Sequence, residues 1–202
     1  MADRSLSEQL FEIGTPFVAA QLRHPTVQAL EAGRLPDAAA RFWLEQDYLF
    51  LHEEIRALTR LAWQAPREHQ ETLLRLAWNV VSTEIPAHQE LSGLFGADLD
   101  HAVMAPVTCS YTSWLTDAAA DYGTGLTALL SGLWGYSTLG QRMALPAEPK
   151  FKRWVGSYQD PGFPQLAQRF AGMVDEAGPP PHRALCTFLT GMAHEIAFWA
   201  VP

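Results

Sequence analysis

Apolar and polar residues follow a helical repeat along most of the chain. Near the N-terminus, Leu6, Leu10, Ile13 and Phe17 recur at intervals of three or four residues, which is typical of one face of a helix. No stretch shows the strict alternation of apolar and polar residues that a half-buried strand requires. The pattern therefore predicts an all-α fold.

Prolines, glycines and capping residues set the bounds of the expected helices. We expect helices over residues 5–23, 25–32, 36–63, 66–94, 98–122, 127–143, 151–158, 164–177 and 182–201. Pro16 and Pro86 are expected to kink two of these helices, and the segment from Gly123 to Gly125 is expected to be a break. The prediction is one domain over residues 1–202, a bundle of about seven or eight helices.

Composition narrows the possible partners. The chain has 202 residues, 48% of them hydrophobic, which suits one sizeable core. Its net charge is −8 and its pI about 5.3, and no run of basic residues could neutralise phosphates. We therefore expect no binding to nucleic acid or to an anionic membrane surface.

Cysteines and apolar runs point to a cytoplasmic protein. Cys109 and Cys186 have no C-x-x-C spacing, so they predict neither a zinc site nor a disulfide framework. The N-terminus lacks the apolar core of a signal peptide, and no apolar run of about 18 residues could span a membrane. We expect free thiols and a cytoplasmic location.

One acidic residue stands out in the longest predicted helix. Asp47 lies among apolar residues that surround most of the helix, and burying an unpaired carboxylate is costly. Phe50, Leu51 and Glu54 follow at i+3, i+4 and i+7 and share its face. An acid beside an aromatic ring suits a pocket for an amine-bearing aromatic ligand. An ordinary core aspartate paired with another group remains the alternative.

Five other polar residues lie at positions that the apolar pattern predicts to be buried: Glu84, Tyr111, Tyr136, Tyr158 and Glu195. Glu195 lies in a second apolar helix, where desolvation would raise the pKa of its carboxyl. A glutamate with a raised pKa is a suitable general acid or base. Two acids facing one aromatic cavity would form a site, although buried polar pairs also stabilise cores without any catalytic role.

Metal binding is a competing interpretation. Potential ligands are Glu53, Glu54, Glu84, His88, His182, His194 and Glu195. Helical bundles hold two irons through Glu-x-x-His pairs, but the chain offers only Glu84-x-x-x-His88, and His182 and His194 lie about three turns apart. It also lacks a phosphate-binding P-loop motif. We expect no metal and no cofactor.

Several segments, in order, resemble the TenA/thiaminase II family. They are residues 24–36 (HPTVQALEAGRLP), 42–51 (FWLEQDYLFL), 83–88 (TEIPAH), 110–115 (SYTSWL), 128–136 (ALLSGLWGY), 151–158 (FKRWVGSY) and 194–199 (HEIAFW). The resemblance spans nearly the whole chain. It implies a fold like that of heme oxygenase, without heme, and a homotetramer or dimer.

The resemblance also implies a function. Family members bind the aminopyrimidine half of thiamin or of its breakdown products and hydrolyse it to a hydroxymethyl-pyrimidine for thiamin salvage. The pyrimidine-binding aspartate of the family corresponds to Asp47 and its catalytic glutamate to Glu195. The substrate pocket would include Phe50, Glu84, Tyr111, Tyr136 and Tyr158.

One position departs from the thiol-dependent branch of the family. The nucleophilic cysteine of that branch corresponds to Gly132, which has no side chain and cannot attack the pyrimidine. The chain resembles the members that lack this cysteine. The leading hypothesis is an aminopyrimidine hydrolase without a cysteine nucleophile. A non-catalytic pyrimidine-binding protein and a metal-dependent oxidase on the same scaffold remain alternatives, whereas direct DNA binding is not expected.

Overall fold

The computed structural model describes residues 4–200 of the chain and is helical throughout, with no strand in that range. It confirms the predicted all-α class. The α-helices are α1 (Leu6–Leu22), α2 (Pro25–Glu31), α3 (Asp37–Gln64), α4 (Arg67–Asn79), α5 (Ile85–Phe95), α6 (Pro106–Ala118), α7 (Tyr122–Gly140), α8 (Pro149–Ser157), α9 (Gly162–Ala177) and α10 (Pro181–Phe198). A π-helical segment, η1 (Val80–Glu84), joins α4 to α5. The predicted end of the last helix, Val201, lies outside the described residues.

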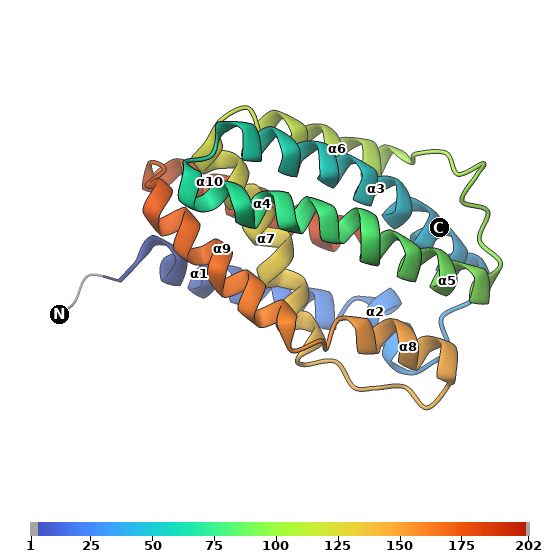
Figure 1. Cartoon of the computed structure of the whole chain (residues 1–202). Coiled ribbons are helices and arrows are strands. Elements are labelled where there is room, and N and C mark those ends of the chain that lie inside the picture. Colours follow the sequence, from blue (N-terminus) through green and yellow to red (C-terminus); the bar gives the residue numbers. More distant parts are fainter. Residues whose placement is uncertain (1–3, 201–202) are drawn as a thin grey trace.

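Two helices organise the bundle. The longest, α3, packs against α4, α5 and α6, while α7 packs against α1, α9 and α10. Figure 1 shows α7 running through the middle of the molecule, with α3 and α6 along one side and α1 and α9 along the other. The short helices α2 and α8 contact each other at one end. None of the described helices is both long enough and apolar enough to cross a membrane.

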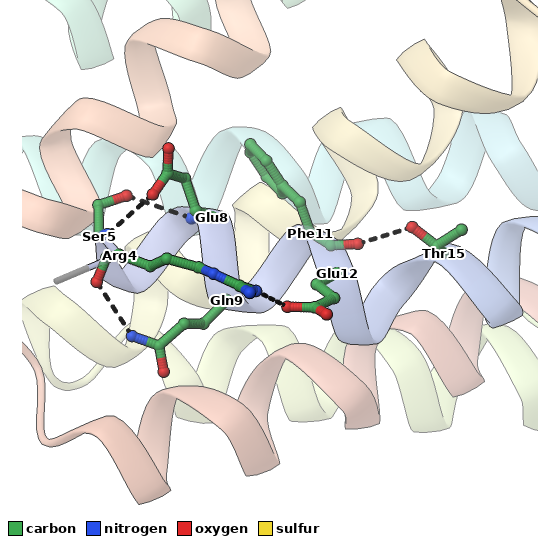
Figure 2. Close-up of polar contacts among 7 residues, drawn as sticks. All are labelled: Arg4, Ser5, Glu8, Gln9, Phe11, Glu12 and Thr15. Carbon is green, nitrogen blue, oxygen red and sulfur yellow. Dashed lines mark hydrogen bonds and ion pairs between the residues drawn. The ribbon is translucent and has the colours of Figure 1, made fainter. Parts of the chain in front are cut away.

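Ser5 starts the first helix as its N-cap. The Ser5 hydroxyl accepts a hydrogen bond from the Glu8 backbone N–H, and the Glu8 carboxylate accepts one from the Ser5 N–H (Figure 2). This reciprocal pair satisfies two backbone donors that the first turn would otherwise leave free. Pro16 lies inside α1, which remains one continuous helix from Leu6 to Leu22.

An aromatic cluster fixes α3 relative to α10. The Trp43 ring stacks on Trp199 at a centroid distance of 5.0 Å, and it also contacts Trp154 at 5.1 Å and Phe198 at 5.6 Å. Trp43 and Trp199 are almost fully buried, and large aromatic rings contribute strongly to core stability. Asp47 lies one turn after Trp43, and Glu195 lies one turn before Trp199, so the cluster also sets the spacing of these two acids.

The helix expected over residues 98–122 is wrong at its start. Residues 98–105 form a non-helical connection with a bend at residues 99–101, and α6 begins at Pro106. The Gln46 side chain holds this connection, because it donates to the Val103 carbonyl at 3.0 Å and accepts from the Ala105 N–H at 2.7 Å. The residue before a proline disfavours helical geometry, so the Ala105-Pro106 step marks the true start.

The expected break at Gly123–Gly125 is also wrong. These residues form the first turn of α7, and Asp121 caps it by accepting from the Thr124 N–H at 2.9 Å. Gly125 is needed for close packing, because a Cβ there would lie 2.6 Å from Leu61 and 2.8 Å from Ala119. Glycine here permits a close helix approach rather than ending a helix.

The long helix expected over residues 66–94 contains a π-helical segment in place of a simple proline kink. Ile85 follows η1 directly, and Pro86 is the second residue of α5. Proline lacks a backbone N–H, so the regular hydrogen-bond pattern cannot continue through it. Single π-helical turns are frequent at functional sites, and η1 carries Glu84 into the cavity described next.

Candidate functional site

A cavity of about 140 Å³ lies between α3, η1, α6, α7 and α10. All seven side chains predicted for the site line it: Asp47, Phe50, Glu84, Tyr111, Tyr136, Tyr158 and Glu195. The fold thus brings together residues from α3, η1, α6, α7 and α10 with Tyr158, the residue that follows α8.

Asp47, which lines the cavity, faces His88, which does not. The Asp47 Oδ2 lies 3.4 Å from His88 Nδ1, and His88 Nε2 lies 2.8 Å from the Leu44 carbonyl oxygen. Since a carbonyl only accepts, Nε2 carries the proton and Nδ1 of the neutral ring has none. Burial lowers the pKa of His88 and keeps the ring neutral. Burial, followed by the charge of Glu84, raises the pKa of Asp47 to about 7.

Glu54 and Glu84 extend this acidic wall. Burial raises the pKa of Glu54 well above its ordinary value, and the charges of Glu84, Asp47 and Glu195 raise it further. Burial also raises the pKa of Glu84, although a hydrogen bond from Asn79 at 2.8 Å opposes the change. Closely spaced carboxyls resist ionising together, so this wall would gain most from a cationic or hydrogen-bond-donating ligand.

Glu54 is a cavity residue that the predicted site omitted. It lies seven residues after Asp47 on α3, so the two side chains share one face of the helix. The signal was therefore present in the sequence as an i+7 spacing between two acids in an apolar helix.

Glu195 has a different environment. Its side chain is 2% exposed, its Oε1 accepts a hydrogen bond from the Tyr111 hydroxyl, and its buried Oε2 has no protein partner within residues 4–200. Burial raises the pKa of Glu195 to about 7, the hydroxyls of Tyr111 and Tyr136 oppose this increase, and the charge of Asp47 adds to it. One oxygen is therefore anchored and the other is available to a ligand or water.

Aromatic rings form the remaining walls. Phe50 and Tyr111 lie 4.7 Å apart between ring centroids, and Tyr136 and Tyr158 lie 5.3 Å apart. The Tyr158 hydroxyl accepts a hydrogen bond from Trp154 Nε1 at 2.9 Å. Burial raises the phenol pKa of all three tyrosines well above 10.0, so they remain neutral hydrogen-bond donors. Such walls suit a planar, polar ring.

Gly132 borders the Glu195 carboxyl. A Cβ at position 132 would lie 2.9 Å from Glu195 Oε1 and 3.5 Å from the Tyr111 hydroxyl. The carboxyl thus occupies space that any side chain at this position would enter. Both cysteines are exposed, and Cys109 does not line the cavity.

Of the side chains considered as metal ligands, Glu54, Glu84 and Glu195 line the cavity, while the others lie outside it. Within residues 4–200, no three histidine, cysteine, aspartate or glutamate side chains are arranged to hold a metal ion. His88 directs its protonated Nε2 at the Leu44 carbonyl, which leaves only Nδ1 available as a ligand atom.

The family model described as "TENA/THI-4/PQQC family" matches residues 15–201 of the chain. Among characterised relatives, an aminopyrimidine aminohydrolase of Halalkalibacterium halodurans is 27% identical over 184 residues, which cover 85% of this chain and 81% of that protein. An aminopyrimidine aminohydrolase of Bacillus subtilis is 25% identical over 163 residues, which cover 76% of this chain and 68% of that protein.

Solved structures support the fold independently. A TenA homologue from P. horikoshii superposes with a TM-score of 0.90 at 24% identity, covering 97% of each chain. A protein described as a TenA family transcription regulator from Silicibacter superposes with a TM-score of 0.87 at 22% identity, covering 96% of this chain and 94% of that one. At such identities the likeness establishes the helical architecture alone.

Proposed function

The chain belongs to the TENA/THI-4/PQQC family, and from this premise we propose that it hydrolyses aminopyrimidine compounds derived from thiamin, releasing an amine and a hydroxymethyl-pyrimidine. The observation that carries the proposal is one small cavity lined by aromatic rings and by two acids, Asp47 and Glu195, whose pKa values are both raised to about 7. The names of the two aminohydrolase relatives supply the substrate class.

Asp47 is proposed to bind the pyrimidine. Its carboxylate would accept two hydrogen bonds, one from the exocyclic amine and one from the adjacent ring nitrogen in its protonated form. The neighbouring Glu84 adds negative charge to the same wall. The rings of Phe50 and Tyr136 line the cavity and would hold the pyrimidine plane by stacking.

Glu195 is proposed to move the proton. The protonated carboxyl would donate to the leaving nitrogen as the C–N bond to the methylene carbon breaks. Water would add to the same carbon and return its proton to Glu195, giving an alcohol and an amine. A carboxyl whose pKa lies near 7 is well matched to both proton transfers near neutral pH. The unpartnered Oε2 is the oxygen free to perform them.

The proposed reaction uses no cysteine nucleophile, cofactor or metal. Gly132 offers no thiol, and the Glu195 carboxyl borders the position that a side chain at residue 132 would take. Cys109 is exposed and outside the cavity lining. We also propose a cytoplasmic homo-oligomer, a tetramer or dimer, in line with the family resemblance.

The test is a substrate assay with purified protein. Aminomethyl- and formylaminomethyl-pyrimidines are incubated with wild-type protein and with the Glu195→Gln variant, and the hydroxymethyl-pyrimidine is measured by chromatography. Product from the wild type alone supports the proposal. Tight binding without turnover of any compound would instead identify a pyrimidine-binding protein. Loss of activity on treatment with iodoacetamide, absent in Cys109→Ser, would contradict the cysteine-independent reaction.

A further inference from the structure

A second hollow lies outside the cavity, between α4 and the N-terminal half of α9. It encloses about 1010 Å³, far more than the 140 Å³ of the cavity. Figure 1 shows α4 and α9 on the same side of the molecule, in front of α7. We call this hollow the α4–α9 groove. Its walls include Trp78, which is 68% exposed, and Leu74, which is 50% exposed.

The groove and the cavity share part of their wall. Leu76 on α4 and Leu166 on α9 line both spaces. Neighbouring residues of the same element also line different hollows. In η1, Thr83 lines the groove and Glu84 lines the cavity. In α9, Gly162 lines the groove and Phe163 lines the cavity. The two hollows therefore adjoin at Leu76 and Leu166, and a ligand longer than one ring would have to pass between these side chains to occupy both.

The two hollows carry opposite charge. Four carboxylic acids and no Lys or Arg line the cavity. Three arginines, Arg67, Arg75 and Arg169, and one acid, Glu71, line the groove. Arg75 pairs with Glu71 at 2.7 Å. Arg67 and Arg169 take part in no ion pair within residues 4–200. In a chain with a net charge of −8, such a basic lining is a local exception that suits an anion.

We propose that the α4–α9 groove binds a phosphate-bearing extension of the substrate whose aminopyrimidine head occupies the cavity. Arg67 and Arg169 would contact the phosphate, and the exposed Trp78 ring offers a surface for an aromatic part of the extension. The inference rests on the proposed function, because the cavity is large enough for one small ring only. Ligand pockets commonly hold roughly 300–1,000 Å³.

Calorimetry with thiamin and thiamin monophosphate tests the proposal, since the two differ only in the phosphate ester. Wild-type protein should bind the phosphorylated compound about tenfold more tightly in low salt, and added salt should reduce this preference. The Arg67→Gln/Arg169→Gln double variant should lose the preference and bind thiamin as the wild type does. Arg142→Gln is the matched control, an exposed arginine outside the groove, and it should retain the preference.

Phenyl phosphate, which lacks the pyrimidine head, separates this inference from the proposed function. It should bind weakly to wild-type and Asp47→Asn proteins and not to the double arginine variant. A protein that binds phenyl phosphate but neither thiamin compound would contradict the proposed function and leave the groove assignment standing. Equal affinity for the two thiamin compounds, or a preference that survives in the double variant, would overturn the groove assignment.

A second copy of the chain could cover the groove instead. In that case Trp78→Ser would reduce the mass measured by sedimentation, and phenyl phosphate would not bind to wild-type protein. This pair of results would also overturn the phosphate subsite.

Discussion

The two ends of the cavity contain acids of similar pKa in different surroundings. At one end, Asp47 lies beside the neutral His88 ring and among two further acids, Glu54 and Glu84. At the other end, Glu195 has one oxygen fixed by the Tyr111 hydroxyl and the other unpartnered. Burial is the main cause of the raised pKa in both acids, but the charge of Glu84 reinforces it at Asp47 and the Tyr111 hydroxyl opposes it at Glu195.

This difference separates binding from proton transfer. The repulsion among several close carboxyls falls most when a ligand supplies positive charge or hydrogen-bond donors. The Asp47 end should therefore act chiefly in binding. The Glu195 carboxyl has a defined orientation, because the Tyr111 hydroxyl holds Oε1, and its Oε2 is left to exchange a proton, so the Glu195 end should act chiefly in turnover. A substitution at one end should therefore leave the function of the other end as an internal reference.

The largest effect is expected for Glu195→Gln. The amide keeps the size of the side chain but cannot exchange a proton, so turnover should fall by at least about 10²-fold. Binding of an aminopyrimidine should stay within about tenfold of wild type, because the Asp47 end is intact. Steady-state kinetics and calorimetry on the same preparation measure the two quantities. Equal losses of binding and turnover in Glu195→Gln would show that Glu195 also binds the ring and that the two roles are not separate.

Asp47→Asn should affect binding at the other end. The change removes the charge and places a donor against the amine of the ring, so affinity should fall by about 2–4 kcal/mol. Calorimetry at pH 8, where the Asp47 carboxyl is ionised in the wild type, gives the cleanest comparison. An unchanged affinity would make Asp47 a structural residue and would place the ring elsewhere.

The sequence predicts those features of the cavity that depend on residues close together in the chain, and not those that depend on contacts between distant elements. The apolar run around Asp47 and the apolar helix around Glu195 predicted two buried acids. Both line one cavity, where Glu195 is buried and the Asp47 side chain is 22% exposed. Asp47 and Glu54 share a helix face, a local relation that the sequence contains. Their coupling to Glu84 depends on how η1 packs beside α3, and this tertiary arrangement has no local signal.

The errors in the predicted helix boundaries also arise from tertiary contacts that have no local signal. Residues 98–105 were expected to be helical, but the Gln46 side chain, more than 50 positions away, binds Val103 and Ala105 instead. Gly125 suggested a break by composition, whereas its actual role is to admit Leu61 and Ala119 at close range. In both segments tertiary contacts override the local preference that the sequence suggests.

Stability should depend on pH at both ends. The pKa of Glu195 is about 7 in the folded chain and 4.5 ordinarily, so the unfolded state ionises first and wild-type stability falls as pH rises from about 4.5 to 7. Glu195→Gln lacks this loss. Its free energy of unfolding relative to wild type should therefore rise by about 1–3 kcal/mol between pH 4 and pH 8.

Asp47→Asn should show the same sign, since the pKa of Asp47 also rises, from 3.8 to about 7. Urea denaturation at pH 4, 6 and 8 measures both variants. The two gains should add incompletely in the double variant, because the charge of Asp47 contributes to the raised pKa of Glu195. A difference between variant and wild type that stays constant with pH would show that these carboxyls do not titrate as described.

The smallest effect is expected for Gly132→Ala. The added Cβ would lie 2.9 Å from Glu195 Oε1, so the flexible carboxyl must move while the helix stays in place. Moving it weakens the hydrogen bond from Tyr111, and that bond lowers the pKa of Glu195. Turnover should fall by about tenfold, and the kinetic limb that requires ionised Glu195 should shift to higher pH. Ring binding at the Asp47 end should not change.

Gly135→Ala provides the matched control on the same helix. A Cβ there meets Met192 Sδ at 3.5 Å, an ordinary contact, and both substitutions replace a glycine inside α7, so each gains helix propensity of up to about 1 kcal/mol. Turnover and its pH profile should match wild type in Gly135→Ala and differ in Gly132→Ala. If the two variants behave alike, the missing side chain at position 132 does not position Glu195, and the two ends of the cavity differ only in their neighbouring charges.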